Sequence, residues 1–445
     1  MSNIYIIVKY GIKELFEIFR DTSIGILDLQ TVDCILQASD IFPTLGKLKK
    51  LYLWGSYTSH FDIQLPASLN LLSLQRGECS SEWLCSLLIK LCELGHPVIC
   101  ELWGIVVQSR REYCGTDFNI HVSDLRSKLL ECDMSNIYII VKYGSKELFE
   151  IFRETSIGIL DLQTVDCILQ ASDIFPTLCK LKKLYLWGSY TGHCDIQPPA
   201  SLNLLILQRG ECSSEWLCSL LIKLCELGHP VICELWYFVV QSRGEDCGTD
   251  SNIHIHNMRS KLLACDMSNI AIIVNNGKKE LFEIFRDTSI GILGLQTADC
   301  ILQASYILPT LSKLEKLYLW GSHMGHFVIR LPASLQCIIL QTGEWSSEWL
   351  YSLLISLSAL DHPVECQLWD FVVHSREEDC GTDSNIHVSD LRSKLLACDM
   401  SNIEILVTHG SKELFEIFRD TSIGILDLQT VDCILQASDI FFHSR

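Results

Sequence analysis

The sequence predicts an α/β solenoid, in which stacked strand–helix units form a parallel sheet with helices on its outer side. Three observations lead to this prediction. The tetrapeptide Met-Ser-Asn-Ile recurs at Met1, Met134, Met267 and Met400, so the chain repeats at an interval of 133 residues. A short L-x-x-L-x-L pattern recurs inside each copy. Segments with helical spacing of leucines separate these patterns, and strands that alternate with helices at a short period form parallel sheets.

The period divides the chain into repeat blocks. These are residues 1–133, 134–266 and 267–399, followed by a truncated fourth block, residues 400–445. No low-complexity tract or Pro/Gly/Ser-rich linker separates them. At Met134 a helical pattern runs directly into a strand pattern. This continuity predicts one continuous solenoid, because a unit that cannot bury its apolar face alone buries it against its neighbours.

Five strands are expected in each block. In the first block their motifs begin at Asn3, Ile24, Leu48, Leu69 and Pro97. The motif that begins at Leu48, Leu-Lys-Lys-Leu-Tyr-Leu, is the clearest. Successive motifs lie 20 to 29 residues apart, except for a longer last interval that contains the polar residues 109–123. We expect this polar stretch to be a loop.

Helices are expected between the strands. Four leucines between residues 84 and 91 recur at helical spacing, after an N-cap candidate at residues 80–82 and before a stop at Gly95. Another helix is expected over residues 13–21. Its predicted apolar face consists of Leu15, Phe16, Ile18 and Phe19.

These motifs resemble a known family. The L-x-x-L-x-L strands and the SSEWLCSLLIKL helix are similar to the ribonuclease-inhibitor type of leucine-rich repeat. The whole block resembles the C-terminal repeat region of invertebrate NOD-like immune receptors. The resemblance implies a horseshoe with a concave parallel sheet and outer helices that recognises ligands. Two features depart from the pattern: Gly55, and Arg76 with Gly77, replace the usual Asn or Cys after the strand, and no G-x-x-x-x-G-K-[ST] motif precedes the array.

Composition and charge exclude several classes of protein. Hydrophobic residues make up 48% of the chain and charged residues 20%, which favours a packed core over disorder. The formal net charge of −19 disfavours nucleic acid and anionic membranes as partners. The N-terminal apolar run is too short for a signal peptide, and no stretch approaches the length of a membrane span. We therefore expect a cytoplasmic protein.

The 22 cysteines support a reducing compartment. Cys79, Cys85 and Cys92 become Trp345, Tyr351 and Ser358 in the third block. A disulfide framework would not survive such replacements in blocks that are otherwise so similar. The cysteines are therefore interpreted as buried thiols that act as small apolar residues.

The residues between the leucines are expected to form the binding surface. Side chains alternate along a strand, so these residues point to the concave face of the sheet. Tryptophan and tyrosine supply large, rigid contact areas and are enriched at binding hot spots. The predicted ligand-binding residues are Tyr5, Lys9, Tyr52, Trp54, Glu101, Trp103, Tyr185, Trp187, Glu234, Trp236, Tyr318, Trp320, Gln367 and Trp369. As an alternative, the tryptophans cover the backbone between neighbouring units.

No motif for catalysis, cofactors or metals is present. The chain lacks G-x-S-x-G, H-E-x-x-H and C-x-x-C. His254 and His256 could share one face of a strand, but they occur in a single block. Cys114 lies in a Cys-Gly-Thr-Asp sequence with no general base near it, which is more typical of a turn. We predict no cofactor, no metal site and no enzymatic activity.

The predicted function is non-catalytic recognition of a protein or pathogen-derived ligand. By resemblance, the chain would be part of an intracellular innate immune receptor. The alternative is a ribonuclease-inhibitor-like or scaffold protein that occludes a partner. Neither end of the chain carries a polar capping repeat, and solenoids need such caps for solubility. We therefore also expect self-association through the uncapped ends.

Overall fold

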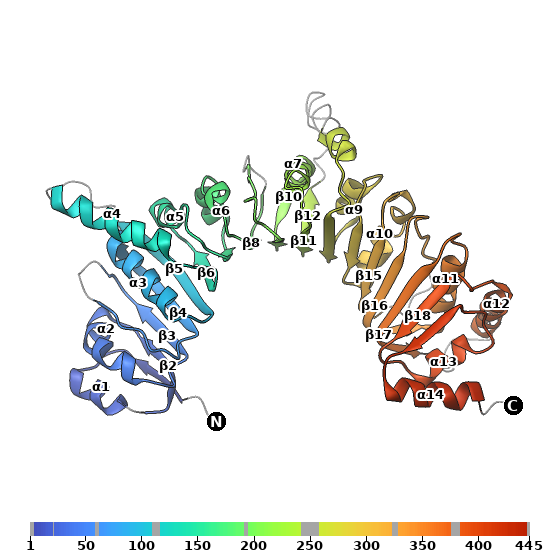
Figure 1. Cartoon of the computed structure of the whole chain (residues 1–445), viewed down its shortest axis with the longest axis horizontal. Helices are drawn as coiled ribbons and strands as arrows, with labels where there is room; N and C mark the ends of the chain where they lie inside the picture. The colour runs from blue at the N-terminus through green and yellow to red at the C-terminus, as the bar shows by residue number, and fades with distance from the viewer. Residues whose placement is uncertain are drawn as a thin grey trace. The chain divides into compact units, whose positions relative to one another are not determined.

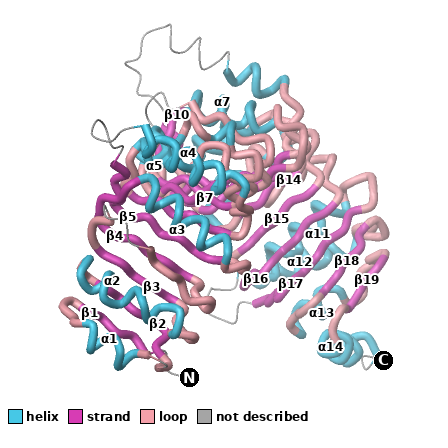
Figure 2. Tube along the Cα trace, turned by 60° about the vertical axis from the view of Figure 1, so that its left-hand side comes forward, coloured by secondary structure: helices cyan, strands magenta, loops and turns pink. Residues whose placement is uncertain are grey.

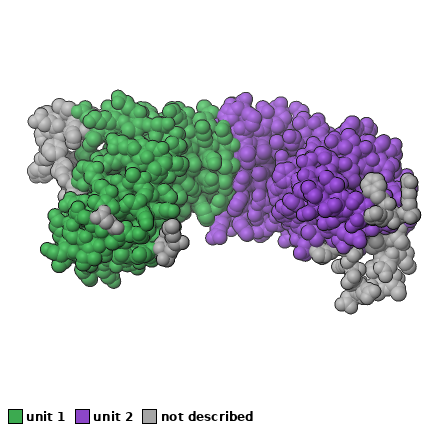
Figure 3. All heavy atoms as spheres, turned by 60° about the horizontal axis from the view of Figure 1, so that its bottom comes forward, with its two compact units in different colours: residues 1–208 green, residues 209–445 purple. Residues whose placement is uncertain are grey.

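The computed structural model describes residues 4–20, 22–57, 62–108, 116–190, 195–241, 258–322, 328–374 and 383–442. Helices and parallel strands alternate through these residues, which confirms an α/β fold with extensive parallel sheet (Figure 1). The chain forms two compact units, residues 1–208 and residues 209–445 (Figure 3). The boundary between the units falls inside the second sequence block.

Unit 1 contains nine strands in the residues that the structure describes. In chain order its elements are β1 (Ile4–Val8), α1 (Lys13–Phe19), β2 (Ile24–Leu29), α2 (Val32–Ala38), η1 (Ser39–Thr44), β3 (Lys50–Trp54), β4 (Leu71–Ser80), α3 (Ser81–Glu93), β5 (Val98–Gln108), α4 (Thr116–Glu131), β6 (Ile137–Lys142), α5 (Lys146–Phe152), β7 (Ile159–Leu162), α6 (Val165–Ala171), η2 (Phe175–Thr177), β8 (Lys183–Trp187) and β9 (Leu204–Gln208). Each strand pairs in parallel with the next strand along the chain.

Unit 2 follows the same plan. Its elements are β10 (Glu211–Ser213), α7 (Ser214–Cys225), β11 (Val231–Trp236), β12 (Val239–Gln241), β13 (Ile270–Asn275), α9 (Lys279–Phe285), β14 (Ile292–Leu295), α10 (Ala298–Ala304), η3 (Leu308–Thr310), β15 (Lys316–Trp320), β16 (Cys337–Ser346), α11 (Ser347–Ser358), β17 (Val364–His374), α12 (Asp383–Ala397), β18 (Ile403–Val407), α13 (Lys412–Phe418), β19 (Ile425–Leu428) and α14 (Val431–Phe442). Strand β11 and strands β13 to β19 pair in parallel in chain order, and β10 pairs separately with β12.

The leucines of the repeat motif form the core, as predicted. Leu48, Leu51 and Leu53 are fully buried, and so are the equivalent apolar residues of the other strands except in β1 and β19, where some are only half-buried. Within each unit the helices lie on one face of the sheet (Figure 2). The other face carries no helix among the described residues, and we call it the free face. It presents the side chains that alternate with the buried leucines.

The predicted signals at the ends of helix α3 are confirmed. The Ser80 Oγ atom accepts a hydrogen bond of 3.2 Å from the backbone N–H of Trp83, so Ser80 is the N-cap. After the helix, Gly95 adopts a φ of +70°, in the left-handed region that favours glycine. The four predicted leucines of this helix are buried against the sheet.

The unusual residues after the strand motif have a structural reason. A Cβ atom at Gly77 would lie 1.7 Å from the carbonyl oxygen of Gly55, so the backbones of strands β3 and β4 approach too closely for any side chain there. Gly343 and Gly321 repeat this relationship in the third block, at 2.3 Å. The departure from the usual repeat pattern therefore marks a close approach between the backbones of two paired parallel strands.

The polar stretch predicted as a loop is partly helical. Residues 109–115 lie outside the described residues, but α4 begins at Thr116 and continues to Glu131. Leu129 is fully buried near the end of this helix, which contacts α3. The prediction was wrong from residue 116 onward, because an anchor near the C-terminal end supports a helix whose earlier residues are mostly polar.

The predicted apolar face of helix α1 is also wrong at one position. Phe16 is fully buried, but the side chain of Ile18 is 70% exposed. The equivalent residues Ile151, Ile284 and Ile417 are buried. A helix of the block before each of these isoleucines, α3, α7 or α11, contacts the helix that carries the isoleucine.

Candidate functional site

The candidate site is the free face of the parallel sheets, where strand register arranges side chains in rows. The central row contains the residue between the last two apolar positions of each motif. In unit 1 it consists of Ile7, Asp28, Tyr52, Ser73, Glu101, Ile140, Asp161, Tyr185 and Ile206. In unit 2 it consists of Glu234, Ile273, Gly294, Tyr318, Ile339, Gln367, Leu406 and Asp427.

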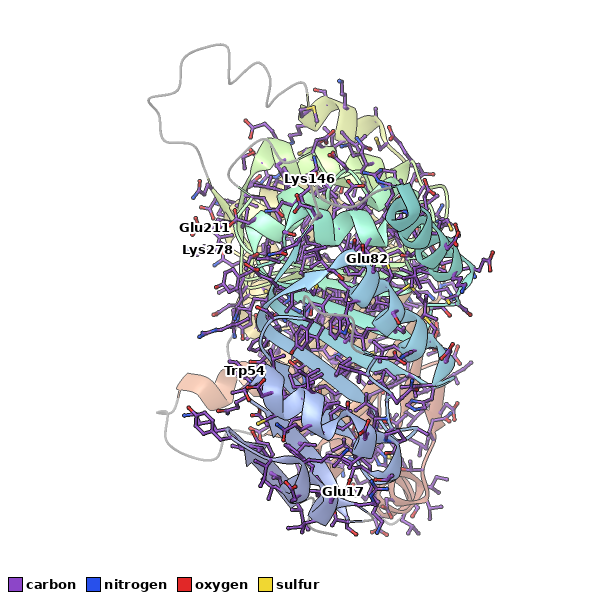
Figure 4. All side chains as sticks on the ribbon, turned by 90° about the vertical axis from the view of Figure 1, so that its left-hand side faces the viewer. Glu17, Trp54, Glu82, Lys146, Glu211 and Lys278 are labelled. Atoms are coloured by element: carbon purple, nitrogen blue, oxygen red, sulfur yellow. The ribbon has the colours of Figure 1, made fainter. Side chains whose placement is uncertain are left out.

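The predicted ligand-binding residues lie on this face, with one exception. Their side chains are half-buried or exposed, and those on strands flank buried apolar residues. Lys9 is the exception, because it lies beyond the end of β1, where it is exposed. Figure 4 labels Trp54 at the end of strand β3, apart from Glu17 and Glu82, which are on helices.

A buried carboxylate lies in the free face of unit 1. Asp161 on β7 is directly beside Tyr185 on β8, and Tyr138 on β6 lies two residues earlier in register. The Tyr138 hydroxyl donates a hydrogen bond of 3.0 Å to Asp161 Oδ2. The rings of Tyr138 and Tyr185 have centroids 5.7 Å apart. With Trp187 these residues form what we call the second Tyr–Asp cluster.

Burial sets the protonation of Asp161. Its side chain is only 4% exposed, and burial raises the pKa of the carboxyl group to about 6. Polar hydrogens of Tyr138, Gln163 and Trp187 oppose this rise because they favour the ionised form. The Oδ1 atom accepts no hydrogen bond from any residue that the structure describes. The site therefore holds a carboxylate with unused acceptor capacity.

The first block contains an equivalent group, the first Tyr–Asp cluster. It consists of Tyr5, Asp28, Tyr52 and Trp54. The Tyr5 hydroxyl donates a hydrogen bond of 3.3 Å to Asp28 Oδ2, and Asp28 is 7% exposed. Its Oδ1 atom also accepts no hydrogen bond within the described parts of the chain. The pKa of Tyr5 is raised, first by burial and then by the neighbouring Asp28 carboxylate.

The third block has lost both partners of the pair. Ala271 stands in place of the tyrosine and Gly294 in place of the aspartate. A Cβ atom at Gly294 would lie 2.7 Å from a ring carbon of Trp320, so this ring covers the strand backbone. Trp320 also stacks on Tyr318, with ring centroids 5.5 Å apart. At this position the tryptophan therefore covers backbone, in agreement with the alternative considered from the sequence.

The other tryptophans have varied partners. The Trp236 indole N–H donates a hydrogen bond of 2.8 Å to Glu234 Oε2, and the pKa of Glu234 is raised because it is half-buried. The Trp103 ring lies 5.0 Å below the Lys142 ammonium, a cation–π contact. Trp369 remains 41% exposed. Ring area is thus available to a ligand at some of these positions.

Three residues of the two clusters are absent from the ligand-binding residues predicted from the sequence: Asp28, Tyr138 and Asp161. Tyr5, at the position equivalent to Tyr138, was predicted. Tyr138 and Asp161 lie 133 residues after Tyr5 and Asp28, so they occupy the equivalent positions of the second block. Comparison of the blocks would also have shown that tyrosine and aspartate disappear together in the third block.

Comparisons and chemical searches add little to this geometry. No family model and no curated protein matches the chain. The described residues contain no group of three or more His, Cys, Asp or Glu side chains that could hold a metal ion. No helix in the described part of the chain is both long and apolar enough to cross a membrane. His254, His256 and Cys114 lie outside the described residues.

Proposed function

We propose that this chain is a leucine-rich-repeat solenoid that binds a protein or pathogen-derived ligand on its free face and catalyses no reaction. The observation that carries the proposal is the register of the sheets. It aligns half-buried aromatic and acidic side chains in rows on a face with no helical cover. Such rows on a rigid support are suited to a protein surface, because tyrosine and tryptophan lose little entropy on binding.

A receptor role is the wider proposal. The sequence resemblance supports a recognition region of an intracellular innate immune receptor. A ribonuclease-inhibitor-like or scaffold protein would use the same face to occlude a partner. The acidic charge of the chain favours a basic protein surface over nucleic acid or an anionic membrane, and the mostly buried thiols are consistent with the cytoplasm. We propose no cofactor.

Self-association is a separate proposal. Several large apolar side chains of strand β1 and helix α14 are exposed, and contact between such surfaces would bury them. They are Ile4, Ile7, Val431, Ile434 and Leu435. We expect light scattering to show concentration-dependent association, which a monodisperse monomer at all concentrations would contradict.

Site-specific crosslinking tests ligand binding by the free face. A photo-crosslinking benzophenone amino acid is placed at Tyr52 or Tyr185, both on the free face. Matched control positions are Leu36 and Leu169 on helices α2 and α6, which are 41% and 48% exposed. We expect crosslinks to the same protein partner from both free-face positions and from neither helical position. Equal crosslinking from both faces would overturn the proposal.

A separate measurement distinguishes binding from catalysis. The purified chain is incubated with the partner that the crosslinking identified, supplied as a separate protein. Mass spectrometry then shows whether the partner has been cleaved or modified. An unchanged partner is expected. Turnover that is abolished by one point substitution would instead establish an enzyme.

A further inference from the structure

We propose that the two Tyr–Asp clusters of unit 1 are binding sites for cationic side chains, and that together they bind a partner segment with two lysine or arginine groups. This inference rests on the proposed function, because it names the ligand chemistry of the same free face. Each cluster provides one buried carboxylate surrounded by aromatic rings. The third block, which lacks the tyrosine and the aspartate, provides no such site.

The two aspartates lack the partners that buried acids normally have. Asp28 and Asp161 are 93% and 96% buried, respectively, since 7% and 4% of their surfaces are exposed. Buried charges in proteins are normally paired or coordinate metals. In each cluster a tyrosine hydroxyl donates a hydrogen bond to Oδ2, and polar hydrogens of Gln163 and Trp187 also favour the ionised form of Asp161. The Oδ1 atoms of both aspartates have no hydrogen-bond partner among the described residues. A cation would supply the missing compensation.

The surrounding rings favour a cation over other ligands. Tyrosine and tryptophan faces attract lysine and arginine groups through the ring quadrupole, and desolvation strengthens the attraction. In the second cluster, two tyrosine rings lie 5.7 Å apart next to Asp161. The cluster lies on the free face, which carries no helix among the described residues (Figure 2). Because Asp161 is only 4% exposed, a cation reaches the Oδ1 atom only if some of the side chains that bury it move.

The nearby Lys142 does not fill the second cluster. Lys142 is on the strand next to Asp161, but its ammonium lies over the rings of Trp103 and Tyr143, at 5.0 Å and 5.7 Å. No lysine or arginine contributes to the pKa of Asp161. In this proposal, the cation at Asp161 is therefore supplied by another molecule.

Strand spacing sets the distance between the two sites. Asp28 is on β2 and Asp161 is on β7, five strand intervals apart in the sheet. At about 4.8 Å per interval the separation is roughly 24 Å. Two cations at this separation on one partner would bind both sites, and the second contact would be intramolecular.

Rigid peptides of defined length test this spacing. A peptide with two lysines separated by seven prolines forms a polyproline helix and places the lysines about 25 Å apart. Lysine–proline–lysine has the same charge but is too short to span both sites. A third peptide replaces one terminal lysine of the long peptide with glutamine. Peptide is titrated into the full chain labelled with 5-fluorotryptophan, and fluorine NMR reports on each tryptophan.

We expect resonance shifts only at the two clusters, and tighter binding of the peptide that reaches both. The resonances of Trp54 and Trp187 shift, whereas that of Trp320 in the third block stays fixed. The long two-lysine peptide binds about tenfold more tightly than either control peptide. Asp28→Asn or Asp161→Asn removes the shift at its own cluster and the bivalent advantage.

Matched variants control for general attraction to an acidic chain. Asp33→Asn and Asp166→Asn make the same charge change on helices α2 and α6, where both aspartates are exposed. Neither should alter peptide binding. The inference is overturned if these variants weaken binding as much as the cluster variants, if Trp320 responds equally, or if no tryptophan shifts.

The outcomes separate this inference from the proposed function. Absence of peptide binding, together with specific crosslinks from Tyr52 and Tyr185, would overturn the cation sites alone. Absence of both would overturn recognition by the free face as well. Circular dichroism of every variant confirms that it is folded.

Discussion

The hydroxyl of Tyr138 donates a 3.0 Å hydrogen bond to one carboxylate oxygen of Asp161, while the other oxygen accepts none from the described residues. The two residues are 23 positions apart in sequence and lie on neighbouring strands. Polar hydrogens of Tyr138, Gln163 and Trp187 compensate only part of the cost of burying the ionised carboxylate, because burial remains the larger influence on its pKa. The buried Asp161 carboxylate therefore opposes folding at neutral pH, where it is ionised. Such unfavourable burial of a charged group is common at binding sites.

Replacement of this aspartate should stabilise the chain at high pH. The pKa of Asp161 is about 6 in the folded chain and the model-compound value is 3.8. A raised pKa means that its favourable contribution is complete below pH 3.8 and is lost as the pH rises through about 6. At pH 8, Asp161→Asn should therefore raise the free energy of unfolding by at most about 3 kcal/mol. Urea unfolding at pH 8 and pH 5 measures the effect.

The helical aspartate provides the control. Asp166→Asn removes an exposed carboxylate five residues away, on helix α6, and should leave both midpoints nearly unchanged. The hydroxyls of Tyr138 and Tyr185 also lie at Asp161, and burial raises the pKa of Tyr138 above its ordinary value of 10.0, so Tyr138 stays neutral in this pH range. The same stability gain at pH 5 as at pH 8 would contradict the assignment.

The close approach of the backbones of strands β3 and β4 should make one glycine irreplaceable. Gly77→Ala would place a Cβ atom 1.7 Å from the Gly55 carbonyl oxygen, so the backbone must move. We expect a loss of roughly 2 to 4 kcal/mol, typical of overpacking that forces a backbone shift. The midpoint of urea unfolding provides the measurement.

A second glycine gives a matched comparison. A Cβ atom at Gly46 would have no heavy atom within 4 Å. Gly46→Ala should be neutral or stabilising by up to about 1 kcal/mol, because alanine lowers the entropy of the unfolded chain. Equal losses in the free energy of unfolding from the two substitutions would show that the backbones of β3 and β4 do not approach each other as closely as described.

The sequence predicted the repeating core well and the site only in part. Burial of leucines at fixed spacing is a local property, so Leu48, Leu51 and Leu53 could be assigned to the core directly. The Tyr138–Asp161 contact depends on register between strands 23 residues apart, which no local pattern specifies. The start of helix α4 was missed because its early residues are polar and its buried anchor, Leu129, comes near the end.

Two cysteine pairs should form disulfides under oxidation. The thiol of Cys92 interacts with that of Cys132, and Cys225 with Cys265; all four are free thiols in the structure. Burial raises the pKa of Cys92 and of Cys225 to about 12, so reaction should be slow at neutral pH and faster at pH 9. Diamide would oxidise each pair to a disulfide and be reduced to its hydrazine.

The third block contains a natural control for this reaction. Ser358 stands where the other blocks have Cys92 and Cys225, so Cys398 has no equivalent thiol partner. Tryptic peptides analysed by mass spectrometry without reduction should contain both predicted disulfides and leave Cys398 free. If the exposed Cys179 forms disulfides and the two predicted pairs do not, the result would contradict the prediction.

Equivalent isoleucines in successive blocks should differ in their contribution to stability, because only some are covered by a preceding helix. Ile151 on α5 is 5% exposed and α3 contacts its helix, whereas Ile18 on α1 is 70% exposed. Ile151→Ala should lower the free energy of unfolding by about 2 to 4 kcal/mol, and Ile18→Ala by less than about 0.5 kcal/mol. Urea unfolding compares two identical substitutions in nearly identical sequence surroundings. A similar loss at both positions would mean that burial depends on the isoleucine's own block and not on stacking between blocks.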